Sequence, residues 1–373
     1  MQKIVVLGAG MVGKAIASDL CYDYDVTAVD INEAALQSLE SNFPLKIQSV
    51  DLSDSAKVKT IVKDFDLVIG AVPGFMGFQT LETVISAGKN IVDISFFDDD
   101  PFKLDDLAKK KNVIAVMDCG VAPGMSNVLL GYHDARMQVD NFECYVGGLP
   151  VVRSLPFQYK APFSPVDVIE EYIRPARFVE NGNLVIRPAL SEPELMEFRN
   201  IGTLEAFNTD GLRTLLSTMK HIPNMKEKTL RYPGHIELMR VFRETGFFDE
   251  APVEINGTSI RPIDFTTKLL FPQWKLHKDD YEFTVMKIII SGKEDGKDAR
   301  YEYHLFDRFD PRTETSSMAR TTGYPCTAVA RLILEKQFAK TGINPPEFIG
   351  ADENCFNKIL AYQMNRNIYY RLS

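Results

Sequence analysis

The stretch that decides the fold is residues 3–20, KIVVLGAGMVGKAIASDL. A short apolar run is followed at once by Gly8, Gly10 and Gly13 in the spacing GxGxxG, and then by a helical pattern. In such a strand–turn–helix unit the first glycine permits a tight turn and the second lets a pyrophosphate approach the backbone. The third lets the helix pack closely on the strand. The stretch therefore predicts the first unit of a dinucleotide-binding domain.

The same alternation continues through the first 120 residues. Short, continuously apolar strands separated by amphipathic helices indicate a parallel sheet that is covered on both faces. The predicted strands are residues 3–7, 26–30, 46–50, 67–72, 90–94 and 113–118. The predicted helices are residues 14–20, 32–41, 55–63, 77–86 and 101–111, and a further helix begins near Ser126. The fold class is α/β, with a doubly wound parallel sheet of the Rossmann type.

The pattern changes after about residue 126. Alternating segments such as FECYVGGL, MKIIISGK and ARYEYHLF indicate an antiparallel sheet with helices, hence an α+β domain. The last two segments flank EDGKD, which predicts a hairpin because Asp-Gly tolerates positive φ. From about residue 318 the chain is again predicted to be helical.

Composition narrows the class of protein. The chain has 373 residues and a net charge of −9, which argues against a nucleic-acid or anionic-membrane surface. It has no apolar run near the roughly 20 residues of a membrane span, and its N-terminus does not have the pattern of a signal peptide. Five scattered cysteines without a CxxC pair suggest free thiols, neither a disulfide framework nor a metal site. We expect a cytoplasmic protein.

Asp30 at the end of the second strand favours NAD over NADP. Its carboxylate can accept from both ribose hydroxyls and would repel a 2′-phosphate, and no arginine follows nearby. Asp51, after the third strand, could lie near the adenine or could cap a helix with Ser53. A Rossmann-like fold without a bound cofactor is the alternative.

Three further strand ends are expected at the edge where open α/β sheets bind ligands. They are AVPGF (71–75), VDISFF (92–97) and MDCGVAPG (117–124), and they should converge on the nicotinamide. The predicted cofactor-binding residues are Gly8, Ala9, Gly10, Met11, Val12, Gly13, Asp30, Ile31, Asp51, Ala71, Val72, Pro73, Gly74, Asp93, Ile94, Ser95, Cys119, Gly120, Val121, Ala122 and Pro123.

A family resemblance rests on motifs spread over nearly the whole chain. VIGAVPGF, VDISFF, MDCGVAPGMSN, YVGGLP, FSPVDVIEEYIRPAR, TLRYPGH and TTGYP occur in this order, and together they resemble the saccharopine dehydrogenase (saccharopine reductase) family. The resemblance implies a Rossmann domain of residues 1–125 completed by residues 319–373. It also implies an inserted α+β domain of residues 126–318 that carries substrate residues and the contact of a homodimer or higher oligomer.

Within the family the likeness is greatest to members that oxidise L-lysine at its ε-carbon. This implies NAD-dependent deamination to 2-aminoadipate 6-semialdehyde, which cyclises to 1-piperideine-6-carboxylate. The family's substrate contacts fall here on Ser95, Phe96, Thr229, Leu230 and Arg231.

Two departures bear on the substrate. Where saccharopine reductases have an aspartate before the Pro-Gly of the sixth loop, this chain has Ala122, and Thr209 in FNTDG stands where they have an arginine. Saccharopine carries an additional glutamate arm, whose carboxylates need cationic partners. The departures therefore favour the smaller substrate, lysine.

The chemistry needs a carboxylate clamp and a proton acceptor. Arg231 is the predicted clamp, because its planar guanidinium matches a carboxylate. Arg213 and Arg174 are second choices, and Tyr159 could line the pocket. His235, one helical turn from Arg231, is the first candidate base. Asp118 and Asp93 are the other candidate catalytic residues, although either could instead bind a substrate ammonium group, and Asp118 could instead cap a helix or brace a loop.

Two alternatives to a lysine dehydrogenase stay open. One is a saccharopine-type enzyme, which acts on the secondary amine formed from an amino acid and 2-aminoadipate semialdehyde. The other is a non-catalytic NAD-binding regulatory protein, which would be favoured if Arg231 and His235 lay far from the nicotinamide.

Overall fold

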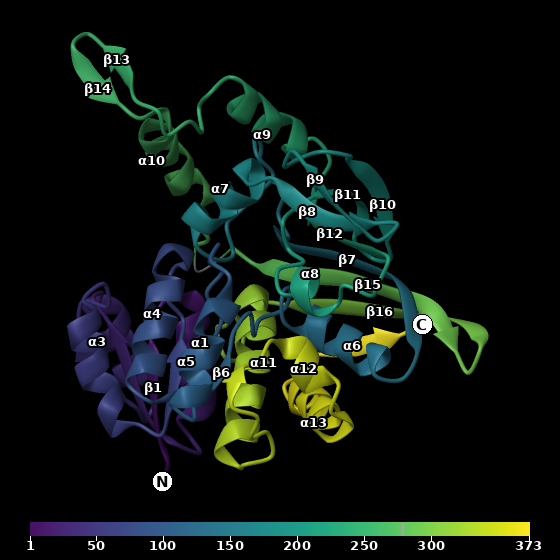
Figure 1. Ribbon diagram of the computed structural model, residues 1–373. Coiled ribbons are helices and arrows are strands. Elements are labelled where there is room, and N and C mark those ends of the chain that lie inside the picture. The colour runs from purple at the N-terminus through teal and green to yellow at the C-terminus, as the bar shows by residue number, and fades with distance from the viewer. Residues whose placement is uncertain (278–279) are drawn as a thin grey trace. The chain divides into compact units, whose positions relative to one another are not determined.

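The computed structural model describes residues 1–277 and 280–373, which form two compact units (Figure 1). Unit 1 consists of Met1–Gln138 and Ala319–Tyr370, and unit 2 of Val139–Met318 and Arg371–Ser373. The sequence predicts the first boundary at residue 125. In the structure unit 1 continues to Gln138, because helix α6 (Met125–Asp134) packs against α12 (Pro346–Gly350) of the same unit. The chain thus leaves unit 1, builds unit 2 and returns.

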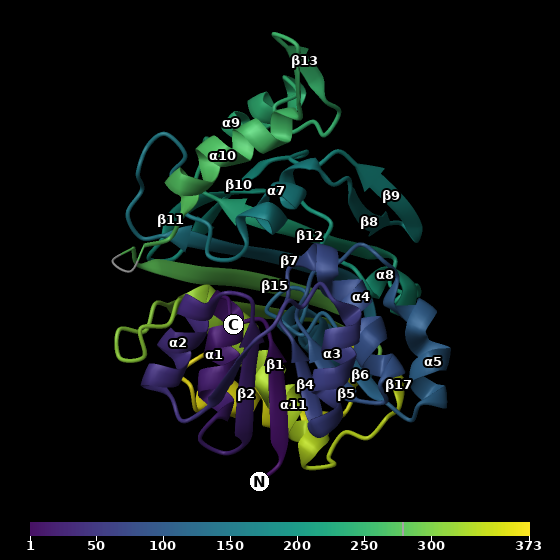
Figure 2. The same cartoon turned by 90° about the vertical axis from the view of Figure 1, so that its left-hand side faces the viewer.

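Unit 1 contains the predicted parallel sheet. Its seven strands run in the order β17-β6-β5-β4-β1-β2-β3, and Figure 2 shows this order from β2 to β17. Their bounds are β1 (Lys3–Leu7), β2 (Asp25–Asp30), β3 (Lys46–Ser49), β4 (Leu67–Gly70), β5 (Asn90–Asp93), β6 (Ile114–Val116) and β17 (Gly342–Ile343). The central strands are fully buried in their apolar positions, as a sheet covered on both faces requires. The order reverses at β1, which places the first glycine-rich turn at the switch point.

The helices of unit 1 lie on the two faces of this sheet. They are α1 (Met11–Leu20), α2 (Glu33–Asn42), α3 (Ser55–Ile61), α4 (Gly74–Ser86), α5 (Asp105–Lys110), α6, α11 (Ser317–Leu334), α12 and α13 (Glu353–Met364). Side-chain caps explain where several begin. Asn32, Asp54 and Asp352 each accept backbone N–H bonds from the first turn of the helix that follows them.

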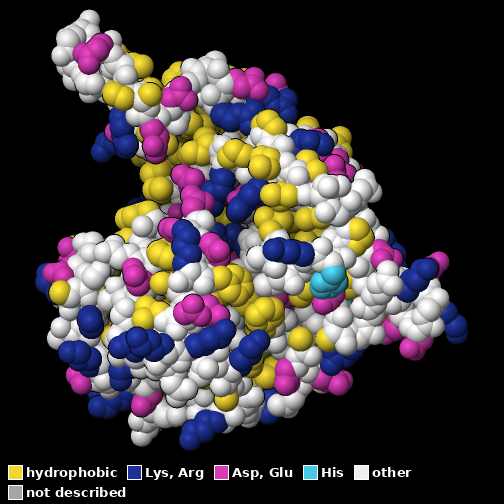
Figure 3. Space-filling view, in the orientation of Figure 1, with side chains coloured by type: hydrophobic (Ala, Val, Ile, Leu, Met, Phe, Trp, Pro, Cys, Tyr) yellow, Lys and Arg dark blue, Asp and Glu magenta, His cyan; other side chains and the backbone are white. Residues whose placement is uncertain are grey.

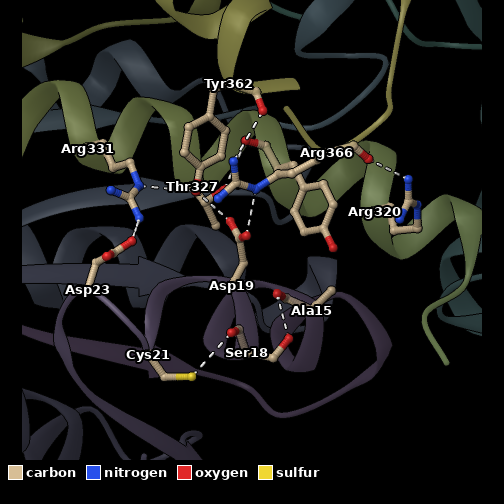
Figure 4. Close-up of polar contacts among 11 residues, drawn as sticks. Ala15, Ser18, Asp19, Cys21, Asp23, Arg320, Thr327, Arg331, Tyr362 and Arg366 are labelled. Atoms are coloured by element: carbon tan, nitrogen blue, oxygen red, sulfur yellow. Dashed lines mark hydrogen bonds and ion pairs between the residues drawn. The ribbon is translucent and has the colours of Figure 1, made fainter. Parts of the chain in front are cut away.

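The C-terminal segment is joined to α1 by a polar network (Figure 4). Asp19 accepts hydrogen bonds from Arg366 Nε and Tyr362 Oη, both at 2.6 Å, and Arg331 pairs with Asp23. Strand β17 extends the sheet beside β6. The sequence predicts only helices in this segment, since a two-residue strand carries no periodic signal.

Unit 2 is built on a nine-stranded mixed sheet. Its main path is β10-β11-β12-β7-β15-β16-β18, with β8 and β9 branching from β12. The strands are β7 (Gln138–Pro150), β8 (Ala176–Glu180), β9 (Asn183–Arg187), β10 (Glu194–Phe198), β11 (Gly202–Asn208), β12 (Asn224–Arg231), β15 (Glu282–Glu294), β16 (Lys297–Arg308) and β18 (Tyr370–Leu372). The expected antiparallel sheet needs one correction, because β12 and β7 pair in parallel. The two strands are separated by more than seventy residues, and local sequence patterns do not show which distant strands pair.

The predicted hairpin of unit 2 is confirmed. Glu294 pairs with Lys297, and Asp295 and Gly296 both have positive φ, 49° and 77°. The helices of this unit are α7 (Pro165–Ile173), α8 (Leu215–Thr218), α9 (His235–Glu244) and α10 (Pro262–Trp274), and a small hairpin joins β13 (Val253–Ile255) to β14 (Thr258–Ile260). Residues of α7, α9 and α10 form one apolar core with Phe207 of β11.

Charged side chains of both signs are interspersed over the face shown in Figure 3, in keeping with the moderate net charge. Among the described residues, no helix combines the length and the apolar character that crossing a bilayer requires.

Candidate active site

The glycine-rich turn between β1 and α1 is shaped for a close approach. Gly8 has φ +111°, and a Cβ there would lie 2.3 Å from the carbonyl oxygen of Ala71. A Cβ on Gly13 would lie 2.0 Å from the carbonyl oxygen of Gly8. A Cβ on Gly10, by contrast, would meet no heavy atom within 4 Å. The turn and the packing therefore require two of the glycines, and the third leaves open space at the N-terminus of α1.

Asp30 lies beside this turn at the end of β2. Its Oδ2 accepts the Ala9 backbone N–H at 2.6 Å, and its Oδ1 accepts the Asn32 N–H at 2.8 Å. Both bonds hold the carboxylate in one orientation next to the glycine turn. Residues 31–35, INEAA, supply no lysine or arginine for a 2′-phosphate.

Asp51 is hydrogen-bonded to Ser53, two residues further along the chain. Its Oδ1 accepts from Ser53 Oγ at 2.6 Å and from the Ser53 N–H at 2.9 Å, and these bonds lower the pKa of Asp51. The N-cap of α3 is Asp54. Asp51 therefore shapes the turn before α3, and its predicted contact with the adenine stays a prediction.

The ends of β4 and β5 are tied together by Asp93. This carboxylate is fully buried, accepts the Ser95 N–H at 2.8 Å and leaves no room for a side chain at Gly70. Ser95 Oγ donates to the Val72 carbonyl at 2.9 Å. Through these contacts Asp93 stabilises the loop after β5. Phe96, which was predicted to contact the substrate, lies in the same loop and is half-buried.

The sixth strand ends in a compact loop over Cys119–Gly124. The Cys119 N–H donates to the Asp93 carbonyl at 3.0 Å, and the Gly120 N–H donates to the Pro123 carbonyl at 3.2 Å. Asp118, just before it, is buried and has φ 54°. Burial raises the pKa of the Cys119 thiol, which makes this residue unsuited to act as a nucleophile. The loops after β1, β4, β5 and β6 all lie at one edge of the sheet, as predicted for a dinucleotide site.

The residues of unit 1 fit a nicotinamide dinucleotide. The open space over Gly10 and the helix N-terminus suit a pyrophosphate, and the oriented carboxylate of Asp30 suits a ribose.

Arg231 is the centre of a buried cluster in unit 2. It is 2% exposed at the end of β12, and its Nη2 pairs with Glu171 Oε2 at 2.6 Å. Its Nε donates to Tyr172 Oη at 3.2 Å, and its guanidinium lies 4.6 Å from the ring centre of Tyr159. Burial raises the pKa of Glu171, while Arg231 opposes this rise.

His235 joins the same cluster through Tyr172. The predicted helical turn between Arg231 and His235 is absent, because Arg231 ends a strand and a Pro-Gly turn separates it from α9. Even so, His235 Nε2 lies 2.9 Å from Tyr172 Oη, and its Nδ1 lies 2.8 Å from the Phe157 carbonyl. Since a carbonyl only accepts, Nδ1 carries the proton, and Tyr172 donates to Nε2. Burial and Arg231 lower the pKa of His235 to about 3, so the ring is neutral.

The remaining predicted substrate residues fall on different sides of the sheet. Thr229 is buried and its hydroxyl lies 3.0 Å from that of Thr209. Leu230 points to the opposite face, into a core with Leu204 and Phe283. This follows from the two-residue period of a strand, which places Thr229 and Arg231 on one face and Leu230 on the other.

The two second-choice arginines, Arg174 and Arg213, have surroundings different from those of Arg231. Arg174 pairs with Glu170 at 3.3 Å, and Arg213 is buried in the turn before α8. From the sequence, Glu171 belongs to an acidic run that is typical of a solvated helix face, so it was set aside as a site residue. Tyr172 and Trp274 were missed, and the Trp274 ring packs edge-on to those of Tyr159 and Tyr172. The motif FSPVDVIEEYIRPAR contains Glu171 and Tyr172, but only the fold shows which of its side chains face Arg231.

Comparisons with known proteins agree with this arrangement. Residues 4–116 match the family model described as the saccharopine dehydrogenase NADP binding domain, and residues 120–366 match that of the saccharopine dehydrogenase C-terminal domain. The chain belongs to the saccharopine dehydrogenase family. The first description names NADP, which differs from the predicted NAD.

Individual relatives are distant in sequence. The saccharopine dehydrogenase [NADP(+), L-glutamate-forming] of Schizosaccharomyces pombe is 25% identical over 272 residues, covering 68% of this chain and 60% of that protein. The alpha-aminoadipic semialdehyde synthase of Arabidopsis thaliana is 24% identical over 242 residues, covering 61% of this chain and 23% of that protein. The matches thus span less than two thirds of either relative.

Solved structures confirm the fold. Apo saccharopine dehydrogenase (L-Glu forming) from Saccharomyces cerevisiae superposes with a TM-score of 0.81 at 18% identity, over 100% of this chain and 99% of that one. Homospermidine synthase from Legionella pneumophila, solved with NAD, gives 0.68 at 12% identity, over 99% and 91%.

Proposed function

We propose that the protein is an NAD-dependent lysine 6-dehydrogenase. It removes the ε-amino group of L-lysine to give 2-aminoadipate 6-semialdehyde, ammonia and NADH, with one water consumed. When bound, NAD supplies the hydride acceptor. The glycine turn would hold its pyrophosphate, Asp30 its ribose, and the loop Cys119–Pro123 would lie at the nicotinamide end.

The observation that carries the choice of lysine is Thr209. The hydroxyl of this buried residue bonds to Thr229, two residues before Arg231, at the position where the family motif has an arginine. Arg231 is therefore the cation we assign to a substrate carboxylate. One clamp suits the single α-carboxylate of lysine, whereas saccharopine brings further carboxylates that need further cations.

The unit 2 contacts give Arg231 a fixed orientation. Tyr172 receives a hydrogen bond from Arg231 and donates one to neutral His235, so the imidazole holds the tyrosine and the tyrosine holds the guanidinium. We therefore assign His235 a positioning role and leave Asp118 as the candidate proton acceptor. Glu171 would exchange its bond with Arg231 for one with the substrate's α-ammonium group.

The second candidate function is saccharopine oxidation, which the names of the relatives favour. It uses the same hydride chemistry but releases glutamate in place of ammonia. The third candidate, a non-catalytic NAD-binding protein, predicts cofactor binding without turnover.

Product analysis separates these candidates. The protein is incubated with NAD and either L-lysine or saccharopine at mildly alkaline pH, and NADH, ammonia and glutamate are measured. We expect NADH and ammonia in equal amounts from lysine, and nothing from L-norleucine, which lacks the ε-nitrogen. NADH and glutamate from saccharopine alone would overturn the proposal, as would NAD binding without turnover.

The clamp is tested by substitution. Arg231→Met should raise KM for lysine far more than it lowers kcat, whereas Arg213→Met, which removes the second-choice clamp of the same unit, should change KM for lysine much less. Thr209→Arg should lower the preference for lysine over saccharopine. Equal effects of Arg231→Met and Arg213→Met on KM would remove the assignment.

A further inference from the structure

A buried carboxylate on the C-terminal segment reaches the loop at the end of β6. Glu347 of α12 is fully buried, and its Oε2 accepts a hydrogen bond from Asn127 Nδ2 at 3.0 Å. Asn127 is also fully buried, in the first turn of α6. The two residues are 220 positions apart in the sequence. No role in binding or chemistry described above uses either of them.

The other end of the Asn127 side chain holds the loop itself. Its Oδ1 accepts the Gly124 backbone N–H at 3.3 Å and the Ser126 hydroxyl at 3.0 Å. Gly124 closes the loop, with φ +137° and no room for a Cβ, which would lie 1.9 Å from the Gly120 carbonyl oxygen. The amide oxygen of Asn127 therefore adds a side-chain contact to the backbone bonds that hold the end of the loop, from the Met125 N–H to the Gly120 carbonyl (2.9 Å) and from the Ser126 N–H to the Val121 carbonyl (3.1 Å).

Glu347 and the Gly124 N–H favour the same orientation of that amide. A carboxylate only accepts hydrogen bonds, so it selects the NH2 end of Asn127 and turns the oxygen toward Gly124 and Ser126. With an apolar residue in place of Glu347, nothing at this contact would distinguish the two amide orientations. A buried carboxylate is costly unless it is bonded, so it is poorly explained by packing alone.

The backbone keeps Glu347 at this distance. Helices α6 and α12 touch through two glycines: a Cβ on Gly131 would lie 2.0 Å from the Glu347 carbonyl oxygen, and one on Gly350 would lie 2.1 Å from the Val128 carbonyl oxygen. The two helix backbones are therefore in close contact, which holds the Asn127–Glu347 pair at this spacing.

We propose that Glu347, acting through Asn127, is a positioning residue for the nicotinamide end of the cofactor site. The inference rests on the proposed function in assigning the loop Cys119–Gly124 to the nicotinamide. The second segment of unit 1, which contains Glu347, thus helps to set the orientation of the nicotinamide ring.

The test compares two ligands that differ at the nicotinamide. Affinities for NADH and for ADP-ribose, which lacks that ring, are measured by titration with the full-length protein, together with the emission of bound NADH. Glu347→Met removes the acceptor, and should weaken NADH binding about tenfold, corresponding to about one hydrogen bond, while ADP-ribose binding stays within about twofold. Glu347→Gln, whose amide oxygen can accept from Asn127, should restore NADH binding and emission.

Two further variants separate positioning from stability. Asn127→Leu keeps roughly the size and removes both the donor to Glu347 and the acceptor for Gly124, and it stands in for Glu347→Met should that variant fail to fold. Asp19→Asn weakens the polar junction of Figure 4 in the same unit, and should lower the unfolding temperature without changing the ratio of the two affinities.

The outcomes are distinguishable. If the variants at Glu347 and Asn127 weaken the binding of NADH and of ADP-ribose by the same factor, the two residues are only structural and the inference is overturned. The inference is also overturned if these variants change neither affinity. If the wild-type protein binds NADH but oxidises neither lysine nor saccharopine, the proposed function fails while the affinity ratio still decides the inference. If the wild-type protein binds neither ligand, both fail.

Discussion

At the scale of single residues, the proposed preference for NAD over NADP rests on Asp30. Asp30→Asn keeps one oxygen to accept from Ala9 or Asn32 and removes the negative charge. A charge-assisted hydrogen bond contributes about 1.5–3 kcal/mol, so we expect KM for NAD to rise by about one to two orders of magnitude. KM for NADP should fall, because a 2′-phosphate is no longer repelled. Steady-state kinetics with both cofactors check this, and a wild-type preference for NADP would contradict it.

His235 makes the stability of the protein depend on pH. Its pKa is lowered from 6.5 to about 3 by burial, so between these values the unfolded chain binds a proton that the folded protein does not. Stability therefore falls as the pH drops from 6.5 toward 3, by about 1.4 kcal/mol per pH unit from this group. His235→Gln should flatten the profile by that slope. Urea unfolding at pH 7, 6 and 5 measures it, and parallel profiles for the two proteins would show that the imidazole is not buried in the neutral form.

At the scale of elements, the contact between α6 and α12 depends on a missing side chain. Gly131→Ala places a methyl group against the backbone of Glu347, and overpacking of this kind costs about 1–3 kcal/mol. We expect a lower unfolding midpoint and faster amide exchange in α12. Ala135→Ser, at the exposed end of α6, is the control. An unchanged midpoint would mean that the helices can separate without cost.

Elements also show what the sequence could predict. The first six strands lie within a few residues of their predicted positions. Apart from the largely exposed β3, they are buried parallel strands, which appear in the sequence as continuous apolar runs. The Asp295–Gly296 hairpin was equally local. Strand β17 and the parallel pairing of β12 with β7 could not be predicted, since they depend on partners far along the chain.

The candidate site divides in the same way. The glycine turn and Asp30 were identifiable because each acts next to its own strand. The contacts of Arg231 with Glu171 and Tyr172 were not, because they join a strand to a helix about sixty positions away. The predicted homodimer stays a prediction.

At the scale of the whole molecule, unit 1 needs both of its segments. A chain that ends at Met318 lacks β17, α12, α13 and nearly all of α11, which contributes the buried residues Cys326, Thr327 and Ala330. We expect this chain to lose NADH binding and the helical signal of unit 1, because the exposed apolar surface has no cover. Circular dichroism and NADH titration check the result, and wild-type affinity in the shortened chain would contradict it.

The return of the chain to unit 1 also sets an order of events on the ribosome. The strands β1 to β6 emerge first, yet the segment that completes their sheet emerges last, after all but the last few residues of unit 2 have been made. The edge of β6 and the uncovered face of α1 must wait through that interval, and unpaired edges of this kind attract other chains. Completion runs opposite to synthesis, so the part of unit 1 that is made earliest waits longest for the segment that covers it.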